Sequence, residues 1–312
     1  MKAATAVALA RAESARRGIP VLPLFWNGSD DSDFDEASGQ WLARPGRAPV
    51  EIALPSRLQV KGRPVGELSP GEAFADLERL AKPPFRPEVG EDLGHFHARV
   101  LAEFFAEDGL LILEARAPAI GRAALPLYRR YQTERKRIAA VVDAEGDRLE
   151  ISLGERPLRE GIGERALFFL KDGRRRLPSL GKYESALARR LNAEDPQLSP
   201  NVLLRPLVQS GLLPVEAVVL GPSEWRYHHQ IRPVFDLLEI PFPRPFPRLD
   251  ALEAGELGRE LPPPGGRHHS PLLEPGNELG APAPLLALAQ VHLEAWGKNL
   301  YYQWIMERSE MS

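Results

Sequence analysis

The spacing of apolar and polar residues predicts an α/β protein in which helices alternate with buried strands. Residues 2–17 mix alanines with charged residues and should form an amphipathic helix that ends near Gly18. The runs 19–26, 110–115 and 215–220 are almost uninterrupted apolar stretches, which are typical of strands covered on both faces. Strands of this kind belong to parallel sheets, so the core is expected to contain one.

Start and stop signals predict where helices lie between these strands. Ser69 and Glu72 form a capping box, with Pro70 at the first helical position. A second helix should cover about residues 91–106, because Gly109 is well suited to end it.

The second half of the chain contains a strand–turn–helix unit. A short helix should begin near Pro206 and end by Pro214. The strand at 215–220 is followed by a Gly-Pro turn at 221–222 and by a helix that Ser223 can cap. In open parallel sheets, ligands bind beyond the carboxyl ends of such strands.

The middle of the chain has a different pattern. Residues 138–153 and 166–180 each place a turn sequence, Glu-Gly-Asp or Asp-Gly, between extended runs, which predicts antiparallel hairpins. A small β-rich insertion is therefore expected at residues 137–193, ending in a helix over about 179–191. The stretch 40–61 is irregular and is expected to contain a short exposed strand.

These patterns divide the chain into four segments. The core is predicted to comprise residues 1–136 and 194–248, with the insertion 137–193 between them. Residues 249–312 contain a linker rich in Pro and Gly, followed by a final helix at about 285–307.

The composition excludes several classes of protein. The 312 residues are 43% hydrophobic and 27% charged, which allows an ordinary hydrophobic core. With a net charge of −3 and no arginine-rich aromatic face, the chain is not expected to bind nucleic acid. No apolar run approaches the roughly 20 residues that span a bilayer, and charges interrupt the N-terminus too early for a signal peptide. There is no cysteine, so disulfides and thiolate catalysis are excluded and a cytoplasmic protein is expected.

An acidic turn follows the first apolar run, where a ligand would be expected. Asp31, Asp33 and Asp35 alternate like the start of a calcium-binding loop, but Glu36 stands where an EF-hand needs glycine. A solvated, helix-capping turn is the simpler interpretation. Alternatively, Asp31 and Asp33 bind an amine, a sugar hydroxyl or Mg²⁺.

Asn201, Arg205 and Gln209 bring polar groups into an apolar segment. The planar guanidinium of Arg205 matches a carboxylate or a phosphate, so it is a candidate ligand-binding group. An internal ion pair with Glu224 is an equally good interpretation of the same residue.

Tyr227 and His228 share one face of the helix after the Gly-Pro turn and are candidates to line a pocket. A core histidine with satisfied hydrogen bonds is the simpler interpretation of His228. His228 and His229 are direct neighbours, and His95 and His97 are two positions apart. On a helix, side chains at either spacing face different directions, so neither pair can bind one metal ion together. No metal site is predicted from these histidines.

Several motifs resemble the BshC family, the proposed cysteine ligases of bacillithiol biosynthesis. LSPNVLLRPLVQ, LLP, GP.E..Y..Q..PVF and IPFP follow one another over residues 198–248 in the order and spacing of that family. IPVLPLFW, the acidic turn DDSDFDEA, and DGLLILEARAPAIGRAALPLY resemble its earlier strand, turn, and next strand with a helix. The similarity covers about residues 2–248.

The resemblance implies a Rossmann-like parallel sheet core with a small antiparallel β insertion and a helical C-terminal tail, related in outline to class I aminoacyl-tRNA synthetases. It implies a reaction that joins cysteine to glucosaminyl-malate through an amide bond, with ATP activating the cysteine carboxylate and Mg²⁺ at the phosphates. On this basis Asp31 and Asp33 are the predicted catalytic residues. The predicted substrate-binding residues are Asn201, Arg205, Gln209, Tyr227 and His228, and the predicted nucleotide-binding residues are Gly221, Ser223 and Trp225.

The sequence also departs from the family pattern. Its acidic turn reads Asp30-Asp31-Ser32-Asp33 where the family has Glu-Asp-His-Asp. The Gly-rich turn with Thr-Gly-Gln-Gln and the long dimerising coiled coil of the family are not found in it. A non-catalytic homologue that binds a small molecule or a partner is therefore the alternative function, and a homodimer is one option for the oligomeric state.

Overall fold

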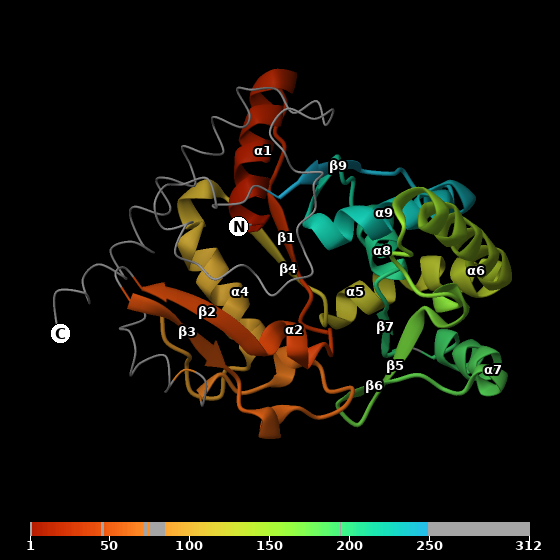
Figure 1. Ribbon diagram of the computed structural model, residues 1–312, viewed down its shortest axis with the longest axis horizontal. Helices are drawn as coiled ribbons and strands as arrows, with labels where there is room; N and C mark the ends of the chain where they lie inside the picture. Colours follow the sequence, from red (N-terminus) through yellow and green to blue (C-terminus); the bar gives the residue numbers. More distant parts are fainter. Residues whose placement is uncertain (1, 45–46, 72–73, 75–84, 194, 249–312) are drawn as a thin grey trace. The chain divides into compact units, whose positions relative to one another are not determined.

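The computed structural model describes residues 2–44, 47–71, 74, 85–193 and 195–248. The chain divides into two compact units, each with a pair of parallel strands (Figure 1). Of the described residues, unit 1 contains those in the ranges 2–60 and 65–114 together with residue 248, and unit 2 contains those in the ranges 61–64 and 115–247.

Unit 1 is a strand–helix–strand arrangement with a hairpin inserted before the helix. Strand β1 pairs in parallel with β4, and Asn27 is the register partner of Glu114. Parallel strands need a long crossover connection, which here contains the antiparallel hairpin β2–β3 and helix α4. The described elements are α1 (Lys2–Arg17), β1 (Leu24–Asn27), α2 (Phe34–Ser38), β2 (Gly39–Arg44), β3 (Arg47–Ala53), the 3₁₀ turns η1 (Ser56–Leu58) and η2 (Val65–Glu67), α4 (Leu93–Phe104), η3 (Ala106–Asp108) and β4 (Leu111–Glu114).

Helices α1 and α4 lie beside the β1–β4 pair (Figure 1). Both contribute apolar side chains to the core that covers these strands. Ala4 and Val7 of α1 are buried with Phe105, which follows α4. Phe25 of β1 and Ile112 of β4 pack against this cluster. Burying a side chain of the size of Val or Phe contributes about 1.5–3 kcal/mol, so this small core is what holds the strand pair in place.

Unit 2 combines a second parallel pair with a small antiparallel sheet. Strands β8 and β9 are parallel and are connected by α9, whereas β5 is antiparallel to both β6 and β7. Its elements are α5 (Pro118–Ala123), α6 (Leu125–Leu153), the 3₁₀ turn η4 (Ile162–Arg165), β5 (Leu167–Lys171), β6 (Arg174–Arg176), α7 (Leu180–Leu191), β7 (Leu198–Pro200), α8 (Leu204–Leu212), β8 (Ala217–Leu220), α9 (Pro222–Leu237) and β9 (Arg244–Pro247).

The parallel pairs and the antiparallel sheet confirm the predicted α/β class, and the second predicted hairpin is also confirmed. Its turn residues Asp172 and Gly173 have φ values of 51° and 64°, the left-handed conformation that tight hairpin turns of type I′ require. Glu72 of the expected capping box, the Pro- and Gly-rich linker, and the final helix at about 285–307 lie outside the described residues.

Helix α6 shows that the first predicted hairpin, at residues 138–153, is wrong. These residues belong to one continuous helix with Gly146 in its interior. A Cβ atom on Gly146 would lie 2.6 Å from Nε2 of Gln230 in α9 and 2.9 Å from the guanidinium carbon of Arg156. The glycine therefore permits the close approach of neighbouring side chains and does not form a turn.

Gln230 is the polar side chain that connects α9 to α6. It is fully buried, and its Oε1 accepts a hydrogen bond of 2.7 Å from the Leu158 N–H. Its Nε2 donates to the carbonyl oxygens of Val142 in α6, at 3.1 Å, and of Leu158, at 3.2 Å. A buried amide that lost these partners would cost about 1–3 kcal/mol, so Gln230 has little freedom to move away from Gly146.

Two smaller expectations are also corrected. The stretch 40–61, expected to contain one short strand, takes part in the two-stranded hairpin β2–β3. Ser223 does not cap the helix after β8: α9 begins at Pro222, Gly221 is its N-cap, and Ser223 is exposed in the first turn. The carboxylate of Glu224 accepts the Gly221 N–H at 2.7 Å in place of a serine cap.

We expect Gly146→Ala to lower the free energy of unfolding by about 1–3 kcal/mol, because the methyl group must displace the buried Gln230 amide. The matched control is Gly121→Ala in α5, where nothing lies within 4 Å of the added Cβ. That change should stabilise the protein by about 0.5–1 kcal/mol, the usual advantage of alanine over glycine in a helix. Urea denaturation of both variants measures the difference, and two variants that are stabilised equally would contradict the packing role of Gly146.

Candidate functional site

A cluster of polar side chains lies at the carboxyl ends of β1 and β4. Asn27 ends β1, Glu114 ends β4, and the two are register partners in the parallel pair. Asn27 is 4% exposed, and its Nδ2 donates to Glu114 Oε2 and to the Gly94 carbonyl oxygen, both at 2.9 Å. Carboxyl ends of parallel strands are where open α/β sheets bind ligands, so this is our candidate site.

Ser29 and His97 complete the cluster. The buried hydroxyl of Ser29 donates to Oε1 of Glu114, so both carboxylate oxygens have a partner from β1 or the loop after it. Nδ1 of His97 lies 3.1 Å from Oδ1 of Asn27. The imidazole also packs edge-on against the Phe25 ring, with centroids 5.6 Å apart.

The sequence of α4 brings His97 to this place. His97, Leu101 and Phe104 recur at helical spacing and therefore lie on one face of α4. Leu101 and Phe104 pack on the unit 1 core, and His97 is one turn closer to the N-terminus of the helix. Phe25 and Asn27 alternate onto one face of β1, which is the face that His97 contacts.

Gly66 supports the loop that carries Ser29. The Gly66 N–H donates to the Ser29 carbonyl oxygen at 3.1 Å. A Cβ atom on Gly66 would lie 2.5 Å from Ser29 Cβ and 2.6 Å from that carbonyl oxygen. Only glycine allows the two backbones to approach this closely, so Gly66 helps to set the position of the Ser29 hydroxyl.

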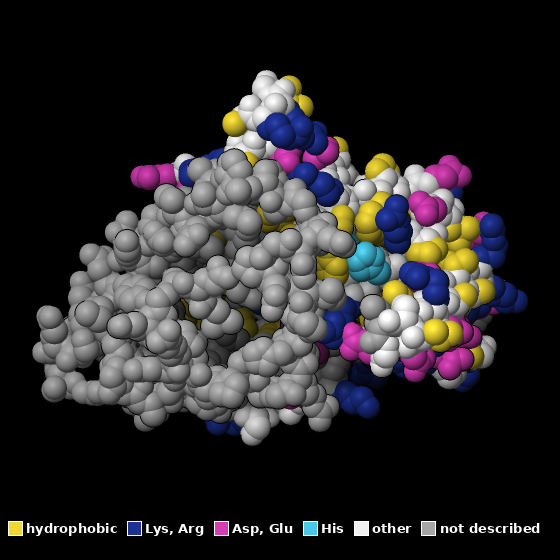
Figure 2. Space-filling view, turned by 45° about the horizontal axis from the view of Figure 1, so that its top comes forward, with side chains coloured by type: hydrophobic (Ala, Val, Ile, Leu, Met, Phe, Trp, Pro, Cys, Tyr) yellow, Lys and Arg dark blue, Asp and Glu magenta, His cyan; other side chains and the backbone are white. Residues whose placement is uncertain are grey.

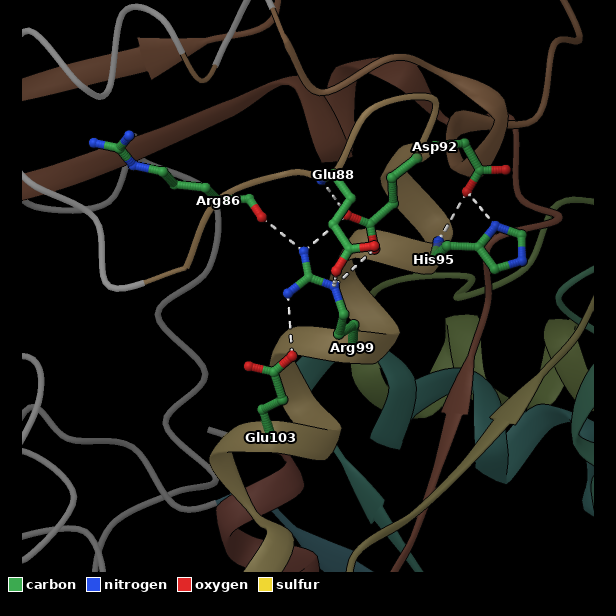
Figure 3. Close-up of polar contacts among 7 residues, drawn as sticks. Arg86, Glu88, Asp92, His95, Arg99 and Glu103 are labelled. Atoms are coloured by element: carbon green, nitrogen blue, oxygen red, sulfur yellow. Dashed lines mark hydrogen bonds and ion pairs between the residues drawn. The ribbon is translucent and has the colours of Figure 1, made fainter.

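An arginine network holds the segment before α4 against the helix (Figure 3). Arg99 donates through Nε and Nη2 to the two carboxylate oxygens of Glu91, at 3.0 and 2.8 Å. Its Nη2 also donates to the Arg86 carbonyl oxygen, at 2.7 Å, and its Nη1 donates to Glu103, at 3.1 Å. These hydrogen bonds raise the pKa of Arg99 and lower the pKa of Glu91, so both groups stay charged.

Asp92 begins α4 as its N-cap. Its Oδ1 accepts the His95 N–H at 2.8 Å and lies 2.8 Å from His95 Nδ1 (Figure 3). The imidazole of His95 is exposed and is engaged at this cap. The first turn of α4, which also supplies the Gly94 carbonyl to Asn27, is thus fixed independently of His97.

The predicted catalytic residues Asp31 and Asp33 follow this cluster directly in the sequence. Asp31 is half-buried, and its Oδ1 accepts the Ser32 N–H at 2.7 Å. Asp33 is exposed, and its Oδ1 accepts the Glu36 N–H at 3.1 Å in the first turn of α2. Asp33 therefore has the helix-capping role of the simpler interpretation, and a catalytic role for either residue stays a prediction.

The other predicted site residues belong to unit 2. Asn201 is buried, its Oδ1 accepts the N–H groups of Leu203 and Leu204, and its Nδ2 donates to the Ile162 carbonyl oxygen. The side chain thus binds the backbone at the start of α8 and connects it to η4, a structural role. Arg205 and Gln209 are half-buried on α8 and stay predicted substrate-binding residues.

Tyr227 and His228 lie together on α9, with ring centroids 5.7 Å apart. His228 is 3% exposed and its ring centroid lies 6.0 Å from that of Phe242. This burial among aromatic rings agrees with the simpler interpretation, a core histidine. The half-buried Tyr227 stays a predicted substrate-binding residue.

The predicted nucleotide-binding residues Gly221, Ser223 and Trp225 lie at the N-terminus of α9. The Gly221 N–H is already bonded to the Glu224 carboxylate at 2.7 Å. A phosphate at this turn would compete with that carboxylate for the N–H and would be repelled by its charge. The Trp225 ring packs edge-on against His229 at 5.9 Å.

Sequence reasoning missed Asn27, Ser29, His97 and Glu114 as a site. His97 was considered only as a metal ligand, although its spacing from Leu101 places it on the apolar face of the predicted helix. Glu114 is the polar end of an apolar run, as is Asn27. A polar residue at the carboxyl end of each of two predicted parallel strands is the signal that could have found them.

The described residues contain no group of three or more His, Asp or Glu side chains arranged to hold a metal ion. None of the helices in the described ranges combines the length and apolar character that crossing a bilayer requires. Figure 2 shows one face of the molecule, on which positive and negative side chains of described residues are interspersed. Neither sign of charge is gathered by itself among these described side chains, and the lack of a nucleic-acid partner stays a prediction.

Comparison with known proteins identifies relatives over most of the chain. Residues 86–249, more than half of the chain, match the family model described as bacillithiol biosynthesis BshC, N-terminal Rossmann-like domain. Proteins named "Putative cysteine ligase BshC" from Geobacillus thermodenitrificans and Geobacillus kaustophilus are each 30% identical over 80% of this chain and 51% of their own length. The protein of that name from Symbiobacterium thermophilum is 30% identical over 79% of this chain. The chain spans about half the length of these curated relatives.

We expect Gly66→Ala to lower the free energy of unfolding by about 1–3 kcal/mol, because the added methyl group forces the backbone at Ser29 to move. Gly71→Ala is the control: the nearest heavy atom to its Cβ, Ser69 Oγ, is 3.6 Å away, an ordinary contact. Urea denaturation compares the two variants. Equal stabilities would show that Gly66 does not support the Ser29 loop.

We expect the stabilising effect of Glu91 to depend on pH. Because Arg99 holds the pKa of Glu91 below its ordinary value of 4.5, ionised Glu91 stabilises the folded state above that pH, and this stabilisation is lost as the pH falls through the lower folded-state pKa. The difference in unfolding free energy between the wild type and Glu91→Gln should therefore shrink on acidification. Glu107→Gln, at an exposed carboxylate, controls for general acid effects. A difference that stays constant with pH would contradict the ion pair.

Proposed function

The chain belongs to the BshC family, and from this membership we propose that it takes part in bacillithiol biosynthesis as a cysteine ligase. In the proposed reaction, the carboxylate of cysteine is activated by ATP and joined to the amino group of glucosaminyl-malate through an amide bond. The family name of the relatives supports the ligase class. The substrates and ATP come from the resemblance of the sequence motifs to that family.

The observation that supports a small-molecule site most strongly is the cluster at the ends of β1 and β4. Asn27, Ser29, Glu114 and His97 come from two strands, a loop and a helix, and form one connected hydrogen-bond network. A network of this kind fixes side-chain positions before substrate binds, which is what catalysis by positioning requires.

The chemistry of amide formation suits this set of residues. An amine attacks an activated carboxyl carbon only when its nitrogen is unprotonated, and no covalent intermediate on the protein is needed. The requirement is a group that accepts a proton together with groups that hold a cationic amine. The absence of cysteine from the sequence is therefore compatible with the proposed reaction.

None of the described residues that were predicted to bind nucleotide forms a phosphate site that fits the proposed reaction. The turn at Gly221 does not fit a phosphate, because the Glu224 carboxylate occupies its N–H donor. Mg²⁺ in nucleotide sites is commonly held by one or two carboxylates together with the phosphates, so Asp31 and Asp33 stay candidates for it. ATP would supply the energy for amide formation by activating the carboxylate.

A homologue that binds a small molecule or a partner without catalysis is the second candidate. It is favoured by the structural roles of two predicted site residues, since Asp33 contacts the first turn of α2 and Asn201 binds the backbone at the start of α8. Ser32 also replaces the histidine of the family's acidic turn. The two candidates differ in one observable, the formation of product.

We expect the purified protein to convert cysteine, glucosaminyl-malate and ATP into the cysteinyl amide, detected by mass spectrometry. Glu114→Gln should lower kcat/KM at least tenfold, about 1.4 kcal/mol of transition-state stabilisation, because it removes the charge at the centre of the cluster. Glu107→Gln, at an exposed carboxylate of the same unit, should leave kcat/KM within about twofold.

Calorimetric titration with glucosaminyl-malate distinguishes the remaining outcomes. Binding that Glu114→Gln weakens, without product from the wild type, would support the non-catalytic homologue. If the folded protein neither binds glucosaminyl-malate nor forms product, both the ligase and a non-catalytic homologue that binds this small molecule would be overturned.

A further inference from the structure

We infer that His97 accepts a proton from the amine substrate through its Nε2 atom, and that Asn27 fixes the imidazole in the tautomer that makes this possible. The inference rests on the proposed function for its substrate, but the tautomer itself follows from hydrogen bonds of the described residues.

The orientation of the Asn27 amide is determined by its neighbours. One end of the amide faces two oxygen atoms, Glu114 Oε2 and the Gly94 carbonyl oxygen, each 2.9 Å away. Only the NH₂ group can donate to both, because the opposite orientation would place three oxygen atoms against one another. The Oδ1 atom of Asn27 is therefore the end that faces His97.

The orientation of Asn27 then determines the position of the proton on His97. Oδ1 can only accept, so Nδ1 of His97, 3.1 Å away, must carry the hydrogen of this contact. A neutral imidazole has one N–H and one bare nitrogen. The bare nitrogen is Nε2, and its lone pair is free to take up a proton.

Nε2 is available to a substrate. It has no hydrogen-bond partner among the described residues, whereas the other ring nitrogen is engaged by Asn27. The His97 side chain is exposed to solvent along part of its surface, although protein surrounds the ring closely enough to lower its pKa. The ring is therefore largely neutral at neutral pH, the state in which it can accept a proton.

Glu114 is the charged group that acts on His97 from the strand pair. Its carboxylate favours the protonated imidazole and so opposes the lowering of the pKa by burial. On the same helix, His95 is engaged by Asp92, and Arg99 is neutralised by Glu91. Once Nε2 has taken up a proton, the nearby Glu114 carboxylate stabilises the imidazolium, so the cluster supports both states of the ring.

The proton transfer is a simple acid–base step. An N–H bond of the substrate ammonium group breaks and an Nε2–H bond forms, giving imidazolium and a neutral amine. The lone pair released on the amine nitrogen is then free to attack an activated carboxyl carbon. The imidazolium returns its proton to water, and His97 is restored.

A purely structural role for His97 makes a different prediction. In that case the Nδ1 hydrogen bond, which joins α4 to β1, would be the whole function of the side chain. His97→Asn separates the two roles, because the asparagine NH₂ group can replace the Nδ1 donor while the Nε2 acceptor is lost. His95→Asn is the matched control on the same helix, at a ring that is exposed and engaged by Asp92.

The first test locates the proton without using activity. Long-range ¹H–¹⁵N NMR spectra of the wild-type protein at neutral pH should show a protonated Nδ1 and an unprotonated Nε2 for His97, assigned by comparison with His97→Asn. In Asn27→Leu, which cannot accept the Nδ1 hydrogen bond, this preference should be lost. A protonated Nε2 in the neutral ring of the wild type would overturn the inference, whether or not the protein is a ligase.

The second test measures the ligase reaction with glucosaminyl-malate, cysteine and ATP over a range of pH. His97→Asn should lower kcat about 100-fold at neutral pH, a typical effect of removing a general base, with little change in KM. Its rate should rise towards alkaline pH, where the amine loses its proton unaided. His95→Asn should stay within about twofold of the wild type. A folded His97→Asn variant with the wild-type pH profile would overturn the inference. If the wild-type protein forms no product, the proposed reaction is refuted, and the NMR experiment alone then decides the tautomer of His97.

Discussion

The structure of unit 1 depends on one buried amide that must satisfy its hydrogen bonds. Asn27 is almost completely removed from water at the end of β1, and a buried polar group without partners would cost about 1–3 kcal/mol. Its partners come from β4, from the first turn of α4 and from His97. Asn27 therefore joins β1 to β4 and to the first turn of α4, and it orients the imidazole of His97.

This arrangement connects the fold with the proposed chemistry. A parallel strand pair directs the ends of its strands to one edge, and here that edge carries a carboxylate, an amide, a hydroxyl and an imidazole in contact with one another. The arginine network around Arg99 and the N-cap Asp92 hold the start of α4 without using any of these groups. The supporting contacts and the proposed reacting atoms are thus separate, and none of these supporting groups of the described residues engages Nε2 of His97.

The sequence predicted helices and strands correctly where their signals lie within the element itself or next to it. Apolar runs identified the strands β1, β4 and β8, and Gly109 closed the segment after α4 as expected. Gly146 was misread as a turn because the reason for it, the side chain of Gln230, is more than eighty positions away in the sequence. The candidate site was missed for the same reason. The sequence predicted a ligand-binding edge after β1, but His97 and Glu114, the hydrogen-bond partners of Asn27, are 70 and 87 residues away from it in the sequence. Sequence spacing alone does not indicate such pairs.

A double-mutant cycle between Asn27 and Glu114 tests the central interaction most directly. Native-state hydrogen exchange of the β1 and β4 amides gives the unfolding free energy of the strand pair in the wild type, Asn27→Ala, Glu114→Ala and the double variant. We predict a coupling energy of about 1.5–3 kcal/mol, as for a hydrogen bond to a charged group. Effects that add to within about 0.5 kcal/mol would show that the two side chains act independently, so that Asn27 would not connect β1 to β4.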